Sequence, residues 1–375
     1  MIYFDYSATT PMSDIALQTY HRVATDFFAN SRSLHTQGIE SEEVLSLSRQ
    51  TIAHALDAMD REVYFTGSGS EATFLALTGL ALANQKRGRT IITTEGEHHS
   101  VHQALTFLQQ RGFTIIYVPL NQYGQVTVNT LQAVLTKDTV LVTIAHANSE
   151  IGTVQDLYSL GKTLAEHDIL FHSDCVQTFG KLPIPTEILS SVSLSAHKCY
   201  GPKGVGAAYI DKDVSWAPFL NGTTHESGFR AGTVDVPAIA AFAAAIDEFL
   251  PVAKQEMKRL KDLRQLFLTS FENDSRISFE GHPIKRLPFH IGLRVKGVEG
   301  QLVMLECNRN GIAISTGSAC RVGESQPSRT LISIGRTPAE AHELIRITFG
   351  RQTTHEEVML LINTFKQLLS RYKGD

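Results

Sequence analysis

Two charged residues of complementary chemistry follow separate apolar runs of the sequence. Lys198 comes shortly after the run 192–194 and precedes a turn rich in glycine and proline. Asp174 closes another apolar run that begins at residue 169. A lysine and an acid at neighbouring strand ends are the pair that pyridoxal phosphate chemistry needs, because the amine forms a Schiff base with the cofactor aldehyde and the carboxylate keeps the pyridine nitrogen protonated. Lys198 alone could be a surface charge, and Asp174 alone could cap a helix.

The elements that must position this pair can be read from the pattern of apolar residues. Between about residues 60 and 210, short β-rich runs alternate with helical stretches, and the runs cover residues 62–66, 90–93, 114–118, 140–144, 169–172, 192–194 and 205–210. Such alternation is typical of a mostly parallel sheet that is covered on both faces. Ligands of open α/β sheets collect beyond the carboxyl ends of the strands, so polar residues at these ends become candidates.

The rest of the chain predicts a second, smaller unit. A long helical stretch over residues 238–273 leads out of the first unit, and apolar runs at 289–295 and 344–349 flank a helix near residues 302–306. Thr354 and Glu357 have the spacing of a capping box and predict a final helix to about residue 372. We therefore expect an α/β protein with a large domain over residues 15–255 and a small α/β domain over residues 1–14 and 256–375.

Composition excludes several classes of partner. The chain has 375 residues, 42% of them hydrophobic, and a formal net charge of -4, which gives no reason to expect nucleic acid or an anionic membrane surface. We find no apolar run of membrane-spanning length and no signal-peptide pattern at the start. The four cysteines lack close CxxC spacing and the histidines lack ligand spacing, so neither disulfides nor a metal site is expected. A cytoplasmic protein with reduced thiols is the expectation.

A glycine-rich loop follows the first run of the sheet. Residues 67–71 contain two glycines and lead into a helix that begins near Thr73. Glycines let the backbone approach an anion, and the free N–H groups of a helix N-terminus favour negative charge. The loop matches neither the P-loop nor the dinucleotide pattern, so ATP and NAD are poor candidates. An ordinary strand–helix turn is the alternative reading.

Three further polar residues follow strand ends. His98 could lie over a planar ring or move protons, although a histidine at a helix start is the simpler interpretation. Asn148 could donate a hydrogen bond to a phenolate-like oxygen, or it could only shape a turn. Gln177, three residues after Asp174, could reach the same oxygen.

These segments resemble those of the class V aminotransferase group, and specifically the NifS/IscS-like cysteine desulfurases, which supply sulfur for iron–sulfur clusters. The resemblance covers nearly the whole chain in order, through residues 5–11, 30–35, 65–71, 97–98, 148–152, 172–177, 195–204, 229–233, 318–320 and 346–351. Each segment is weak evidence alone, whereas the ordered set is specific. It implies a fold type I pyridoxal phosphate transferase, with a mostly parallel seven-stranded sheet in the large domain.

The resemblance also implies a role for each candidate residue. Lys198 would form the Schiff base and later remove the α-proton of the substrate, Asp174 would partner the ring nitrogen, and His98 would stack on the ring. Arg351 would hold the substrate carboxylate, for which a bidentate guanidinium is well shaped. The remaining contacts would be Asn148 and Gln177 to the ring hydroxyl oxygen, Asn148 to substrate, and Gly69, Ser70, Ser195, His197 and, from the second subunit of a homodimer, Thr233 to the phosphate.

Cys320 is the residue that distinguishes cysteine desulfurases from their transaminating relatives. Thiolate is the attacking species, so the resemblance implies that Cys320 takes sulfur from L-cysteine as a persulfide, releases L-alanine and passes the sulfur to an acceptor protein. This sulfur would serve iron–sulfur cluster or other thio-cofactor assembly. Cys175, Cys199 and Cys307 are expected to be buried small hydrophobes.

Two other functions are compatible with these residues, one of them enzymatic and the other not. A selenocysteine lyase or a class V aminotransferase would use the same cofactor site, and a cofactor-bearing binding protein would regulate partners without catalysis. A Cys320→Ala variant distinguishes a desulfurase from a transaminase, because only the desulfurase should lose sulfide production.

Overall fold

The computed structural model describes residues 1–317 and 326–371. Its main feature is a seven-stranded sheet with the order β2-β8-β7-β6-β5-β3-β4, in which β8 alone runs antiparallel to its neighbours. The strands are β2 (Val63–Thr66), β3 (Thr90–Thr93), β4 (Thr114–Tyr117), β5 (Thr139–Thr143), β6 (Leu170–Asp174), β7 (Ser191–Ser195) and β8 (Gly206–Ile210). The prediction of a mostly parallel seven-stranded sheet is confirmed.

Helices cover both faces of this sheet, as its buried apolar strands require. One apolar core joins it to α3 (Gly69–Asn84) and α4 (His99–Gln109). The core on the other face involves α2 (Thr36–Ala55), α6 (Leu157–Ala165) and α7 (Val236–Thr269). The short helix α5 (Val128–Gln132) lies between β4 and β5 in the chain.

A third core contains both the start and the last third of the chain. Its antiparallel sheet has the order β12-β13-β10-β9, formed by Ser315–Thr316, Leu344–Thr348, His290–Val295 and Ile277–Glu280. The chain start enters this part as β1 (Ile2–Tyr3), which pairs in parallel with β11 (Ile312–Ala313). The helices here are α8 (Gly300–Arg309), α9 (Arg329–Ser333), α10 (Pro338–His342) and α11 (His355–Arg371). The structure thus has one part around the large sheet and another around this core, but the residue boundaries of the two expected domains stay a prediction.

The predicted capping box at Thr354 is confirmed. The Thr354 N–H donates to the Glu357 carboxylate at 3.0 Å, and the Glu357 N–H donates to the Thr354 hydroxyl at 3.2 Å. These reciprocal bonds satisfy two N–H groups at the beginning of α11, which accounts for where that helix begins.

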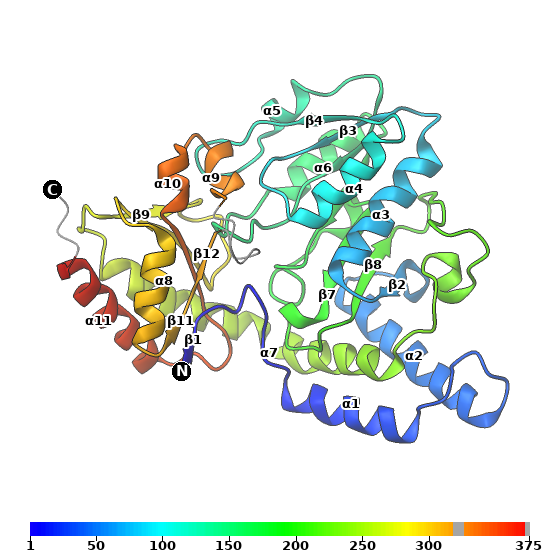
Figure 1. Cartoon of the computed structure of the whole chain (residues 1–375). Coiled ribbons are helices and arrows are strands. Elements are labelled where there is room, and N and C mark those ends of the chain that lie inside the picture. The colour runs from blue at the N-terminus through cyan, green and yellow to red at the C-terminus, as the bar shows by residue number, and fades with distance from the viewer. Residues whose placement is uncertain (318–325, 372–375) are drawn as a thin grey trace.

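The 34-residue helix α7 passes beneath both parts of the molecule and packs against α1 (Asp14–Asp26) (Figure 1). Among the described residues it is the one helix that is long and apolar enough to cross a membrane, so the expectation of no such run was wrong. In the structure, 61% of its most apolar stretch is buried inside the protein. Its apolar residues, among them Phe242 and Phe249, contribute to the two large cores.

Candidate active site

Lys198 lies at the end of the short helix η3 (Ala196–Lys198), directly after β7. Its Nζ donates hydrogen bonds to the carbonyl oxygens of Ser7 at 2.6 Å and Ala8 at 2.8 Å. Burial lowers the pKa of Lys198 to about 8, with further lowering by Arg346 and Lys181. A substantial fraction of this amine is therefore neutral near physiological pH, as a nucleophilic or basic lysine requires.

Asp174 is the last residue of β6, the strand next to β7 in the sheet. The side chain is buried, and its Oδ1 accepts a hydrogen bond from the Val176 N–H at 2.9 Å. Burial raises the pKa of Asp174, while the nearby His98 and Lys198 oppose that shift. The structure thus brings these three predicted residues within electrostatic range of one another.

His98 caps the N-terminus of α4, so the simpler interpretation of this histidine describes part of its role. Its Nδ1 lies 3.2 Å from the Ser100 backbone nitrogen and 2.8 Å from the Ser100 hydroxyl. These contacts fix the ring orientation. Burial lowers the pKa of His98, Asp174 opposes this shift and Lys198 adds to it, so a neutral ring is favoured.

Glu97 is a residue of this region that the sequence did not single out. Both oxygens of its carboxylate accept from the Ala145 N–H, at 3.1 and 3.0 Å, and Oε1 also accepts from the Thr94 hydroxyl at 2.9 Å. These bonds fasten the turn before His98 to the chain just beyond β5. Burial raises the pKa of Glu97 to about 8. Its place directly before His98, in a segment after a strand end, was the available signal.

Gln177 and Ser7 leave buried polar atoms directed into the same region. The Gln177 Nε2 donates to the Ser7 carbonyl at 3.1 Å, which ties Gln177 to the acceptor used by Lys198. The Gln177 Oε1 and the Ser7 Oγ are buried and have no hydrogen-bond partner among the described residues. Because buried polar atoms without partners are costly, they indicate a place where a polar ligand is bound.

Asn148 has the role that the sequence reading left as an alternative, that of shaping a turn. Its Oδ1 accepts from the N–H groups of Glu150 at 2.8 Å and Ile151 at 2.9 Å. Its Nδ2 donates to Gly96 O at 3.0 Å and Thr330 Oγ1 at 3.1 Å. A contact to a ring oxygen or to substrate therefore requires Asn148 to give up one of these bonds, and its binding role stays a prediction.

The predicted phosphate loop lies against the strand that precedes Lys198. Gly69 begins the 16-residue helix α3, and a Cβ added to it would lie 2.9 Å from the Ser195 Cβ. Gly206 permits this approach, because a Cβ there would lie 2.7 Å from the Gly69 nitrogen. Gly69 and Ser195 are thus brought together at the N-terminus of a helix, where an anion is favoured.

The other predicted phosphate contacts occupy different surroundings. Ser70 is exposed in the first turn of α3, and His197 Nδ1 lies 3.2 Å from the Thr9 hydroxyl. Thr233 is exposed in the segment that leads to α7. The role of Thr233 in a second subunit remains a prediction.

The two arginines of the segment 346–351 occupy different environments. Both terminal nitrogens of Arg351 are engaged by the Glu248 carboxylate at 3.1 Å, and its guanidinium lies over the rings of Tyr200 and Phe249. The Arg351 guanidinium is thus held by an ion pair with Glu248, and the assignment of Arg351 as the carboxylate anchor stays a prediction.

Arg346 is a second candidate for that contact, because its charge acts on Lys198. Its Nη2 lies 2.8 Å from Asp5 Oδ1, its Nη1 donates to Ser149 O at 3.2 Å, and it is the charged group that most lowers the pKa of Lys198. The buried Nε has no hydrogen-bond partner in the described part of the chain. The sequence reading named Arg351 and not this arginine, although both occur in the same motif. Its position within the buried strand β13 was the available signal.

Cys320 lies outside the described residues. Cys175, Cys199 and Cys307 are unpaired and buried, as predicted, and burial raises the pKa of each thiol to about 12. A thiol of this kind supplies very little thiolate, so these three cysteines are poor nucleophiles.

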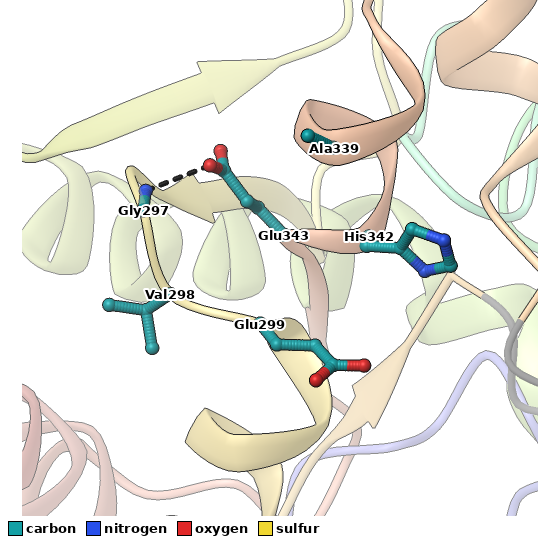
Figure 2. Close-up of a pocket in the computed structure, with 6 residues that line it drawn as sticks. All are labelled: Gly297, Val298, Glu299, Ala339, His342 and Glu343. Atoms are coloured by element: carbon teal, nitrogen blue, oxygen red, sulfur yellow. Dashed lines mark hydrogen bonds between the residues drawn. The ribbon is translucent and has the colours of Figure 1, made fainter.

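No group of three or more potential metal ligands occurs within residues 1–317 and 326–371. A surface hollow of about 470 Å³ lies at the turn after β10 and at α10, where Glu343 accepts a hydrogen bond from the Gly297 N–H at 2.8 Å (Figure 2). None of the predicted site residues lines this hollow. The chemistry therefore belongs with Lys198, where a buried acid, a low-pKa amine, unpartnered polar atoms and a helix N-terminus suit an aromatic nitrogen heterocycle that carries a phosphate.

Comparisons with known proteins agree with this chemistry. The family model described as "Aminotransferase class-V" matches residues 2–361. A protein of Halalkalibacterium halodurans named "Putative cysteine desulfurase NifS" is 45% identical over 375 residues, which is 100% of both chains. "Cysteine desulfurase IscS" of Dictyoglomus turgidum is 36% identical and covers 99% of this chain and 95% of its own. A solved structure titled "NIFS-LIKE PROTEIN" superposes with a TM-score of 0.91 at 30% identity, over 99% of both chains.

Proposed function

Since this chain belongs to the class V aminotransferase family and is a cysteine desulfurase of the NifS/IscS group, we propose that it acts through pyridoxal 5'-phosphate held at Lys198 and a persulfide on Cys320. The observation that carries the cofactor assignment is the low pKa of the Lys198 amine beside the buried Asp174. Bound pyridoxal phosphate supplies an aldehyde that links to amines and a ring that takes up electrons.

Lys198 moves the protons of the reaction. With its pKa lowered to about 8, the amine is a usable nucleophile toward the aldehyde near neutral pH. Once substrate has displaced it, the free Nζ can accept the proton from the substrate Cα. The Ser7 and Ala8 carbonyls, which accept hydrogen bonds from Nζ, hold the amine in place for both steps.

Asp174 and His98 serve the ring from two directions. Asp174 would hold the proton on the pyridine nitrogen of the bound cofactor, and the nearby His98 and Lys198 favour the ionised carboxyl that this requires. His98, oriented by Ser100, would stack on the ring and exclude water from it. The N-terminus of α3 at Gly69 and Ser70 would hold the phosphate, together with Ser195 and His197.

Arg346 binds the substrate carboxylate in this proposal. Asp5 and Ser149 orient its guanidinium, and its charge is close enough to Lys198 to lower the pKa of that amine. Substrate bound there has its carboxylate compensated and its Cα near the lysine.

Cys320 then attacks the sulfur of the bound cysteine as a thiolate. A sulfur–sulfur bond forms, the carbon–sulfur bond of the substrate breaks, and its electron pair stays with the carbon fragment, which leaves as L-alanine after protonation. The outer sulfur of the persulfide goes to a thiol acceptor, for iron–sulfur cluster or other thio-cofactor assembly. The raised pKa values of Cys175, Cys199 and Cys307 support Cys320 as the nucleophile by leaving it as the better thiol.

We also propose a cytoplasmic homodimer. Phe28 and Leu34 are 74% and 96% exposed, and Arg32 between them donates to Thr224 O at 2.6 Å, in the segment that leads to Thr233. Exposed apolar side chains on either side of a residue that contacts Thr224, nine positions before the predicted intersubunit ligand Thr233, support an interface there. The three free thiols support a reducing compartment. Light scattering should give twice the chain mass of 41.3 kDa, and cell fractionation tests the location.

The decisive experiment is incubation of the purified protein with L-cysteine, followed by mapping of sulfur by mass spectrometry. Without an added thiol, we expect one alanine per active site and added sulfur on Cys320. With a thiol reductant, which reduces the persulfide and releases its outer sulfur, we expect equal alanine and sulfide over many cycles. Sulfur on Cys175, Cys199 or Cys307 without any on Cys320 would overturn the site assignment. Absence of turnover would favour a cofactor-bearing binding protein.

A further inference from the structure

The short helix η4 (His225–Gly228) contains two consecutive residues with unfavourable backbone angles. Glu226 has a φ of 46° and Ser227 a φ of 52°, in the left-handed region that residues with a Cβ rarely adopt. Neither is glycine or asparagine, the residues that tolerate this conformation best. Such strain persists only where surrounding contacts impose it, and it is often found at functional sites.

The Glu226 carboxylate supplies these contacts. Arg49 of α2 binds it through both terminal nitrogens, at 2.7 and 2.8 Å, and the Phe65 N–H donates to it at 2.7 Å. Arg49 also donates to Val63 O at 2.7 Å and lies 4.9 Å from the centre of the Phe65 ring. Only 2% of the Glu226 side chain is exposed. The strained turn is therefore fastened to β2, just before the predicted phosphate loop.

A second contact fastens the same segment to the far end of that loop. Arg230 Nε lies 3.3 Å from Glu71 Oε1, and the other oxygen of Glu71 accepts from the Gly67 N–H. A Cβ added to Gly67 would lie 3.5 Å from Arg230 Nη2. Glu226 and Arg230 thus hold the two ends of the loop 67–70, through Phe65 before it and Glu71 after it.

We propose that Glu226 is a positioning residue for cofactor binding, which fixes the loop 67–70 of its own chain and the following segment that carries Thr233. The inference rests on the proposed function, because it takes loop 67–70 and Thr233 as phosphate ligands. A carboxylate clamp that spans both elements would keep their N–H and hydroxyl groups aimed before the phosphate arrives, which improves affinity by preorganisation. An ion pair with a purely structural role would instead affect thermal stability alone.

Glu226→Gln tests this with the shape of the side chain preserved. Glu280→Gln is a matched control, because Glu280 is also a buried carboxylate held by two arginines, Arg294 at 2.6 Å and Arg336 at 3.1 Å, in the other core. Apo protein of each variant is titrated with pyridoxal phosphate, and its melting temperature is measured. Both substitutions should lower the melting temperature, and only Glu226→Gln should raise the dissociation constant of the cofactor, by at least tenfold. An unchanged dissociation constant in Glu226→Gln would overturn the inference.

Arg230→Gln provides a second variant if Glu226→Gln does not fold. Arg230 is partly exposed, so its loss should leave folding intact while loosening one end of the loop, and it should raise the dissociation constant about threefold. Affinity equal to wild type would again overturn the inference. Failure of the proposed function looks different: the wild-type apo protein itself would then not bind pyridoxal phosphate.

Discussion

Lys198 and Gln177 donate hydrogen bonds to the same acceptor, the carbonyl oxygen of Ser7, from Nζ at 2.6 Å and from Nε2 at 3.1 Å. A backbone carbonyl close to the chain start therefore aligns two side chains that follow different strands of the large sheet. This acceptor is an uncharged carbonyl, and burial keeps the pKa of the amine low. The arrangement leads to predictions that separate chemistry from structure.

The rate at which apo protein forms its imine with pyridoxal phosphate should rise with pH and level off above about 8. Only the neutral amine attacks the aldehyde, and burial lowers the pKa of Lys198 to about 8, where an ordinary lysine would titrate near 10.5. Stopped-flow absorbance of the imine measures this rate. Lys198→Ala is the control and should form no such chromophore. A rate that still climbs steeply between pH 9 and 10 would show an unperturbed lysine.

Arg346→Lys should raise KM for L-cysteine at least tenfold, because a lysine cannot reproduce the bidentate contact to a carboxylate. Arg351→Lys is the matched control in the same segment and should change KM less than threefold, since Glu248 engages that guanidinium. Steady-state kinetics at saturating cofactor compare the two. The reverse order of effects would return the role to Arg351.

Cys320→Ala should reduce sulfide release from L-cysteine by more than 100-fold and leave cofactor binding unchanged. The substituted side chain lacks the thiolate that attacks the substrate sulfur. Cys307→Ala is the control, because burial raises the pKa of that thiol to about 12, and it should retain activity within twofold. Sulfide assays with reducing agent present give the comparison. Full activity in Cys320→Ala would exclude a persulfide on this residue and favour another lyase or transaminase chemistry.

The free energy of unfolding should fall as the pH drops below about 6.5. His172 is fully buried between the hydroxyls of Ser191 and Ser193, and burial lowers its pKa to about 3. Between these pH values the histidine of the unfolded chain is protonated, whereas that of the folded chain is neutral. Stability is then lost with acidification between about pH 6.5 and 3, by up to about 1.4 kcal/mol per pH unit for this residue. Urea unfolding at several pH values measures the slope.

His172→Gln is the variant that isolates this contribution. It should lower stability at pH 7, because the two hydroxyls lose their partner, but it should also make the pH slope shallower by about one proton. An identical slope in variant and wild type would place the acid sensitivity elsewhere, for example at His146, whose pKa burial lowers to about 4.

The sequence predicted the large sheet and the Lys198–Asp174 pair because both rest on local signals. Buried parallel strands are short apolar runs, and polar residues directly after them are carried to one edge of the sheet. The helix expected over residues 238–273 is present as α7, but the sequence reading overlooked that it is long and apolar enough to cross a membrane, because a buried core helix and a membrane span share length and composition.

The sequence has no signal that separates Arg351 from Arg346 as the ligand of the substrate carboxylate, and the reason is physical. The two arginines occur in one segment, and only the packing of β13 against Asp5 and of Arg351 against Glu248 separates them. Asn148 is a similar case, because its partner Thr330 is 182 positions away along the chain. Backbone acceptors such as the Ser7 carbonyl leave no side-chain signal at all.

The pairing of β1 with β11 has a consequence for biosynthesis. Residues near the amino end are synthesised first, but their partners are Ile312, Ala313 and Arg346, in the last fifth of the chain. These contacts can therefore form only after most of the polypeptide has been synthesised. A translation product that stops before residue 312 would lack this strand partner of the chain start, the segment whose Ser7 and Ala8 carbonyls accept hydrogen bonds from Lys198. Long-range pairing of this kind is completed late in folding.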